Sequence, residues 1–157
     1  MAYILIFLVR YSIHTAARSF NDSKIDCKNN GGSLLLSPME TIWEIIKDPI
    51  INEYGDRWYW GRGNWFWTGI TSSGDGKTWK WVDGGIVQDP KTIKNGDIYQ
   101  CAVNVPAVYP PIQFLRVGQS CDREANYVCQ YTGMIFISFL DIFSNLSLHI
   151  VQRIVVI

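Results

Sequence analysis

Hydrophobic and polar positions along the chain follow two different periods. The densest pattern is residues 65–84, WFWTGITSSGDGKTWKWVDG, where two aromatic runs flank a polar cluster at residues 71–77. Short apolar runs separated by Gly, Ser and Asp are typical of two strands joined by a turn. Four of the seven tryptophans lie in this stretch. We therefore expect it to supply much of one core.

The segment before this stretch has a helical period. Ser19 or Asn21 can cap a first helix, whose modest apolar face includes Cys27. The run Asn-Asn-Gly-Gly at residues 29–32 tolerates left-handed backbone and should end that helix. Residues 33–36 are then predicted to form a short buried strand.

A second helix is predicted from residue 37. Residues 37–40 read Ser-Pro-Met-Glu, which places a cap, a first-turn proline and a capping-box glutamate in order. We expect Pro49 and Asn52 to end this helix. Its apolar positions recur at helical spacing: Met39, Ile42, Trp43, Ile45, Ile46 and Ile50.

The second half of the chain is irregular before it returns to strand patterns. Residues 85–99 are long and polar for a hairpin connection, so they are a candidate functional loop. Residues 100–105 alternate as a strand, residues 106–111 are proline-rich and should break it, and residues 114–117 resume the pattern.

The four cysteines lie at positions 27, 101, 121 and 129. This spacing lacks the close Cys-x-x-Cys pairs of a tetrahedral zinc site. An even number of cysteines without a metal pattern indicates two disulfides formed in an oxidising, extracellular compartment. The cysteine positions alone permit three connectivities.

Three ordered motifs resemble the signature of C-type lectin-like domains. Residues 67–70, Trp-Thr-Gly-Ile, stand where that family has Trp-Ile-Gly-Leu, and residues 79–84 match its W-x-W-x-D-G segment. The closing segment, residues 121–129, resembles the family's last Cys-to-Cys segment. The signature residues are Trp67, Gly69, Trp79, Trp81, Asp83 and Gly84.

The resemblance implies an α+β fold, with two helices flanking antiparallel sheets and a long irregular loop region. It pairs Cys27 with Cys129 and Cys101 with Cys121, the short form of the family. It covers residues 11–132 as the lectin-like domain. Residues 1–10 are an apolar N-terminus that resembles part of a signal segment, and residues 133–157 are an apolar tail whose role, including membrane contact, stays open.

Composition argues against catalysis and against nucleic acid. The 14 basic and 14 acidic side chains cancel, with no long run of one charge. The only histidines, His14 and His149, lie far from any sequence context for a nucleophile–base pair. We therefore expect a binding protein and not an enzyme.

The family's calcium-binding triplets are altered in this sequence. Calcium needs six to eight oxygen ligands. The loop's only proline triplet is Asp-Pro-Lys at residues 89–91, and its lysine would repel a cation. The triplet expected before the third cysteine is replaced by apolar and basic residues at positions 114–118. Only weak oxygen candidates remain: Asp89, Asn95 and Asp97, with Gln88 as a fourth.

Two aromatic clusters are candidates for ligand binding, because Arg and aromatic side chains make frequent binding hot spots. Packing against the core is the alternative role of both. The candidates are Arg57, Trp58, Tyr59, Trp60, Arg62 and Tyr109.

We therefore expect an extracellular recognition domain that binds a protein or other non-classical ligand without calcium or another cofactor. The alternatives are a carbohydrate-binding lectin, with a degenerate calcium site or aromatic stacking, and a fragment or scaffold domain without a competent site. The sequence leaves the oligomeric state open.

Overall fold

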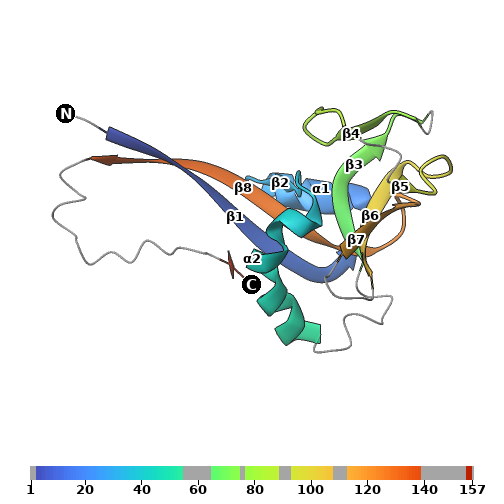
Figure 1. Ribbon diagram of the computed structural model, residues 1–157, viewed down its shortest axis with the longest axis horizontal. Coiled ribbons are helices and arrows are strands. Elements are labelled where there is room, and N and C mark those ends of the chain that lie inside the picture. Colours follow the sequence, from blue (N-terminus) through green and yellow to red (C-terminus); the bar gives the residue numbers. More distant parts are fainter. Residues whose placement is uncertain are drawn as a thin grey trace.

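The structure, a computed structural model, describes residues 3–54, 65–74, 77–88, 93–107, 113–138 and 155–156. The elements are β1 (Tyr3–Arg18), α1 (Phe20–Asn29), β2 (Ser33–Leu34), α2 (Met39–Tyr54), β3 (Phe66–Ser72), β4 (Trp79–Trp81), β5 (Ile93–Lys94), β6 (Cys101–Ala107), β7 (Gln113–Gln119), β8 (Ala125–Ser138) and β9 (Val155–Val156). The described strands form one sheet in the order β5-β7-β6-β3-β8-β1-β9, with β2 beside β8 and β4 beside β3 (Figure 1). The predicted α+β fold with two helices is confirmed, although the sheet is mixed and not purely antiparallel.

Helix α1 begins and ends where its caps predict. The Ser19 hydroxyl accepts a hydrogen bond from the Asp22 backbone N–H at 3.2 Å, so Ser19 and not Asn21 is the cap. Gly31, two residues past the helix, has a φ of 79°, a left-handed value that glycine adopts without strain. The chain then turns directly into β2.

Helix α2 differs from the prediction at its C-terminal end. It runs through Pro49 to Tyr54, so the expectation that Pro49 and Asn52 end it is wrong. Proline in a helix interior removes one backbone hydrogen bond and costs about 3 kcal/mol. Ile46 and Ile50 on either side of it are fully buried in the core, and their burial offsets that cost.

Strand β6 likewise continues through Pro106 to Ala107, so residues 106 and 107 do not break the strand as predicted. Its pairing with β3 ends at Asn104, opposite Phe66. Beyond that point β6 pairs with β7 alone. Proline is tolerated there because one edge of the strand needs no N–H donor.

Strands β1 and β8 form a long antiparallel ribbon that extends past the helices toward the N-terminus (Figure 1). Tyr3 pairs with Ser138 at its far end. The strands therefore cross both expected domain limits, residues 11 and 132. This pairing leaves no local pattern in the sequence, because the paired residues are more than 100 positions apart. Strand β9 pairs with β1 at Tyr11 and Ser12.

Both disulfides join the cysteines that the resemblance pairs. Cys27 in α1 is bonded to Cys129 in β8, which ties the first helix to the ribbon. Cys101 at the start of β6 is bonded to Cys121, which clips the turn after β7. The described residues contain no free cysteine.

The predicted aromatic hairpin is confirmed as β3 and β4. Ile70 pairs with Trp81 and Ser72 with Trp79 across it. Trp67 and Trp79 are both fully buried, in separate clusters on the two sides of the sheet. The close packing depends on Gly69, because a Cβ there would lie 2.3 Å from the carbonyl oxygen of Leu35.

Candidate functional site

The signature residues build the frame of the loop region. Asp83 accepts a hydrogen bond from the Gly85 backbone N–H at 2.9 Å, and Gly84 has a φ of 96°. The backbone N–H of Gly84 closes this turn on the carbonyl of Trp81 at 2.8 Å. Asp83 and Gly84 therefore shape the turn after β4.

Loop residues after this turn are anchored by apolar side chains. Val87 and Ile93 are buried against Ile70 and Trp79, in one cluster beneath the loop. The Val87 N–H also donates to the carbonyl of Trp79 at 3.0 Å. The described part of the predicted functional loop is thus fixed to β3 and β4 at both ends.

Two of the weak calcium candidates, Asn95 and Asp97, lie in one turn after β5. Asn95 has a φ of 56°, and its carbonyl oxygen accepts from the N–H groups of Ile98 and Tyr99 at 3.2 and 3.4 Å. The side chains of Asn95 and Asp97 are exposed, as is that of Gln88. Asp89, the remaining candidate, lies outside the described residues.

The backbone of this turn packs directly on β7. A Cβ placed on Gly118 would lie 2.5 Å from the carbonyl oxygen of Asn95 and 2.9 Å from its carbonyl carbon. Contacts below 3.0 Å force the backbone to move. The neighbouring Val117 pairs with Lys94 and has no side-chain oxygen. Position 118, three residues before the third cysteine, therefore has no room for a carboxylate side chain in this backbone arrangement.

The Arg/aromatic candidates at residues 57–62 and Tyr109 lie outside the described residues. The strands that flank them are described. β3 begins at Phe66, β6 ends at Ala107, and Ala107 pairs with Gln113 at the start of β7. Because β6 runs antiparallel to both neighbours, these three strand ends lie at the same end of the sheet. The turn at Asn95 follows β5, which pairs with β7 toward the other end.

One described Arg–aromatic contact lies beside the start of β3. The Arg123 guanidinium carbon lies 4.4 Å from the ring centroid of Trp65, a cation–π contact. Trp65 is half-buried, and its carbonyl accepts from the Asn126 N–H at 2.9 Å. The pair is an Arg–aromatic contact formed between the segment before β8 and the residue that precedes β3.

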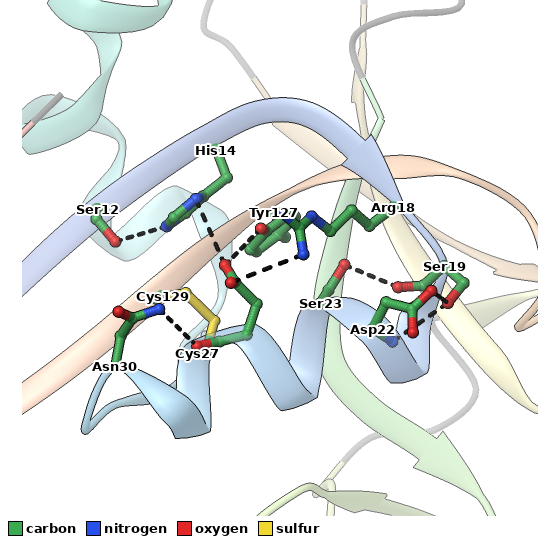
Figure 2. A network of polar contacts seen from close by, with 11 residues as sticks. Ser12, His14, Arg18, Ser19, Asp22, Ser23, Cys27, Asn30, Tyr127 and Cys129 are labelled. Atoms are coloured by element: carbon green, nitrogen blue, oxygen red, sulfur yellow. Dashed lines mark hydrogen bonds and ion pairs between the residues drawn. A yellow bond between two sulfur atoms is a disulfide. The ribbon is translucent and has the colours of Figure 1, made fainter.

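A polar network that the sequence did not predict lies between β1, α1 and β8 (Figure 2). The Tyr127 hydroxyl donates to Asp26 Oδ2 at 2.7 Å, and the His14 ring stacks on the Tyr127 ring with centroids 4.4 Å apart. Arg18 and His14 approach the same carboxylate at 3.7 and 3.8 Å. Ser12 Oγ lies 2.9 Å from His14 Nε2.

This network is not a metal centre. Ligand atoms of His14, Asp26 and Cys129 lie within 4.8 Å of one another. Cys129 is bonded to Cys27, so its sulfur is not a thiolate ligand. The guanidinium of Arg18 faces the carboxylate and would oppose a cation there. The cluster is better understood as a set of ionisable groups.

Asn104 on β6 is a second polar feature that the sequence did not predict. It is buried, and neither its amide nitrogen nor its amide oxygen has a hydrogen-bond partner. Its cross-strand neighbours are Phe66 on β3 and Arg116 on β7. An unpaired buried amide lowers stability, which gives this side chain a measurable signature.

A family model described as "Lectin C-type domain" matches residues 16–131. This span is well over half of the chain, so the chain belongs to the C-type lectin domain family. C-type lectin domains are non-catalytic binding domains. The prediction of a binding protein agrees with this membership.

Solved structures of the same fold are similar in backbone and distant in sequence. The C-type lectin domain of murine dendritic cell inhibitory receptor 2, in complex with N-glycan, is 18% identical with a TM-score of 0.59, covering 80% of this chain and 91% of that one. The mouse scavenger receptor C-type lectin carbohydrate-recognition domain is 23% identical with a TM-score of 0.55, covering 78% of this chain and 87% of that one. Human lithostathine is 15% identical with a TM-score of 0.55, covering 78% of this chain and 91% of that one.

Among curated proteins, none matches the chain. Within the described residues, no helix has both the length and the apolar character that crossing a bilayer requires.

Proposed function

We propose that this chain is an extracellular recognition domain that binds a protein ligand without calcium. The extracellular assignment rests on the two disulfides, which form and persist in oxidising compartments. We assign recognition to residues 11–132, and we treat residues 1–10 and 133–157 as flanking segments.

The contact between Gly118 and Asn95 carries the calcium-independent part of this proposal. Calcium sites of extracellular modules need several carboxylate or carbonyl oxygens converging on one point. The backbone packing at Gly118 opposes a carboxylate there, and Val117 contributes no oxygen. Asn95, Asp97 and Gln88 are then the described side-chain candidates, and even with Asp89 they supply fewer side chains than the six to eight oxygens that calcium takes.

A protein ligand is favoured by the residue types in two connecting segments of the chain. Tryptophan, tyrosine and arginine are the residue types that most often form binding hot spots. In sequence, five of these residues precede β3 in the segment that follows α2, and the sixth lies between β6 and β7: Arg57, Trp58, Tyr59, Trp60 and Arg62, and Tyr109. The Arg123–Trp65 contact supports an Arg–aromatic surface beside them.

Calcium titration of the full-length, disulfide-bonded chain tests the first part. We expect no saturable heat by calorimetry and no change of melting temperature with calcium. Asp97→Ala and Asp89→Ala should behave like the unaltered chain, as should Asp122→Ala, which removes an exposed carboxylate that is not among the calcium candidates. Binding with a Kd of about 0.1–1 mM that Asp97→Ala abolishes and Asp122→Ala keeps would overturn the proposal.

A screen against secreted and cell-surface proteins tests the second part. The double variant Trp58→Ala/Arg62→Ala should lose binding to the captured partner, whereas Asp122→Ala should keep it. A partner that binds the double variant at full affinity would move the site away from residues 57–62.

Glycan binding is the second candidate function. It is favoured by the shared fold of the murine receptor domain solved with an N-glycan, and by the oxygens of Asn95 and Asp97 in one turn. A glycan array probed with and without a chelator separates a degenerate calcium site from aromatic stacking. Intact-mass analysis of the native product tests the third alternative, a fragment or scaffold without a competent site.

A further inference from the structure

His14 lies where three elements meet. Its ring comes from β1, stacks on Tyr127 of β8 with an interplanar angle of 5°, and turns Nδ1 toward Asp26 of α1 (Figure 2). The side chains of His14 and Asp26 are 29% and 22% exposed, so both are shielded but reachable by protons. A charge change on this ring therefore alters the contacts of β1 with both β8 and α1.

Both ring nitrogens already have polar neighbours. The carboxylate beside Nδ1 favours the neutral tautomer that carries its proton on Nδ1. Nε2 then accepts from the Ser12 hydroxyl at 2.9 Å, and Ser12 Oγ also lies 3.1 Å from the Tyr131 hydroxyl. A second proton on Nε2 would turn Ser12 from donor to acceptor toward the ring, so the hydroxyl proton of Ser12 would need another acceptor.

The pairing of β1 with β8 also becomes irregular next to His14. His14 and Tyr127 are the last regular pair of β1 and β8, and the register shifts before the next pair, Arg18 with Ala125. Within this irregular corner the Arg18 carbonyl accepts the indole N–H of Trp67 at 2.8 Å. Asn126, next to Tyr127, pairs with Phe66 of β3. The two halves of the sheet are joined here.

We propose that His14 is an acid-sensitive switch, and that its protonation loosens the junction between the β1–β8 ribbon and the sheet built on β3. The groups that face the ring among the described residues are Asp26, Arg18, Tyr127 and Ser12. Arg18 is a fixed cation on the carboxylate that a protonated ring would need. The switch therefore adds a second cation to a site that already has one.

The electrostatics support this direction. Burial lowers the pKa of His14 below its ordinary value of 6.5 and Arg18 lowers it further, while Asp26 raises it without reversing the shift. The folded state thus binds its proton less readily than the unfolded state. Stability is then complete above pH 6.5 and falls as the pH drops below 6.5, until the folded pKa is passed.

Two measurements test the switch on the full chain with both disulfides. The background variant His149→Gln removes the only other histidine, so the remaining imidazole signals in an NMR titration belong to His14. We expect a pKa below 6.5, a still lower value in Asp26→Asn, and a higher value in Arg18→Gln. A pKa at or above 6.5, or shifts of the opposite sign in the two variants, would overturn the proposal.

Hydrogen exchange measures the loosening itself. The protection factor of the Trp67 indole N–H should fall between pH 7 and pH 5, about tenfold for each unit that the pKa of His14 lies below 6.5. The Val103 amide in the centre of β6 is the internal control and should change less, because opening at the junction is local. His14→Gln should abolish the pH dependence at Trp67. Equal loss at Trp67 and Val103, or an unchanged dependence in His14→Gln, would contradict the switch.

Discussion

Trp67 donates its indole N–H to the carbonyl oxygen of Arg18 at 2.8 Å, although the two residues are 49 positions apart. The bond connects the central signature tryptophan to the end of β1, immediately before α1. The Trp67 ring also meets Phe20 edge-on, with centroids 5.5 Å apart. One buried side chain therefore fixes the first strand, the first helix and β3 together.

Replacing Trp67 by Phe should destabilise the protein by about 2–4 kcal/mol, because the Arg18 carbonyl loses its donor and the smaller ring leaves a cavity. Trp81→Phe is the matched control, since Trp81 is only half-buried and should cost less. Chemical denaturation of both variants measures the difference. An equal loss in the two would mean that the Arg18 bond contributes little.

Gly118→Asp should fail to create a calcium site and should instead destabilise the fold by about 1–3 kcal/mol, because its Cβ collides with the Asn95 carbonyl. Gly118→Ala should show most of the same loss, which separates the steric cause from charge. Gly133→Ala is the control, because a Cβ at Gly133 meets no atom within 4 Å. Thermal unfolding with and without calcium measures both effects. A higher melting temperature of Gly118→Asp with calcium than without it would contradict the prediction.

Asn104→Leu should be neutral or stabilising, by up to about 2 kcal/mol. The substitution removes two buried polar atoms that lack partners and replaces them with apolar volume. Asn126→Leu should instead lower stability, because Asn126 is also buried but has a polar interaction that the substitution removes. Urea unfolding compares the two variants. A similar loss in both would indicate a partner for Asn104, such as an enclosed water molecule.

The two disulfides should differ in their contribution. In the chain-entropy relation the 102-residue separation of Cys27 and Cys129 corresponds to about 5 kcal/mol, and the 20-residue separation of Cys101 and Cys121 to about 3 kcal/mol. Paired Cys→Ala variants measured by denaturant unfolding give this order. A greater loss at Cys101 and Cys121 would show that local geometry outweighs loop entropy.

The Tyr127 hydroxyl should lose its proton only at a higher pH than an ordinary tyrosine does. Burial, and then its hydrogen bond to Asp26, raises the pKa of Tyr127 well above the ordinary value of 10.0. The folded state holds the phenolic proton more tightly, so stability is complete below pH 10 and falls as the pH rises above it. The slope of melting temperature against pH between about pH 9.5 and 11 should be shallower in Tyr127→Phe. Tyr131→Phe is the control, and a slope that it changes equally would contradict the assignment.

Local signals predicted most of the fold correctly. The Ser19 cap, the glycines after α1 and the polar turn between β3 and β4 each act within a few residues, so their effect is readable in the sequence. Pro49 was misread for the same reason. Its local preference predicts a helix end, but burial of Ile50 by tertiary packing decides the outcome.

The network around His14 could not be predicted in this way. Asp26 and Tyr127 are 101 positions apart, and only the pairing of β1 with β8 brings His14 and Tyr127 together. Alternation within each strand places Ser12 and His14 on one face, but it does not show which face of β8 they meet. The network depends on a register that neither strand encodes alone.

The bond between Cys27 and Cys129 also decides how the molecule responds to a protease. A single cut at any peptide bond between these residues leaves both pieces in one covalent molecule. The nicked protein would keep its mass on a non-reducing gel, apart from an added water, and would separate into two bands only after reduction. A cut in an exposed loop between these cysteines would therefore not release a fragment until the disulfide itself was reduced.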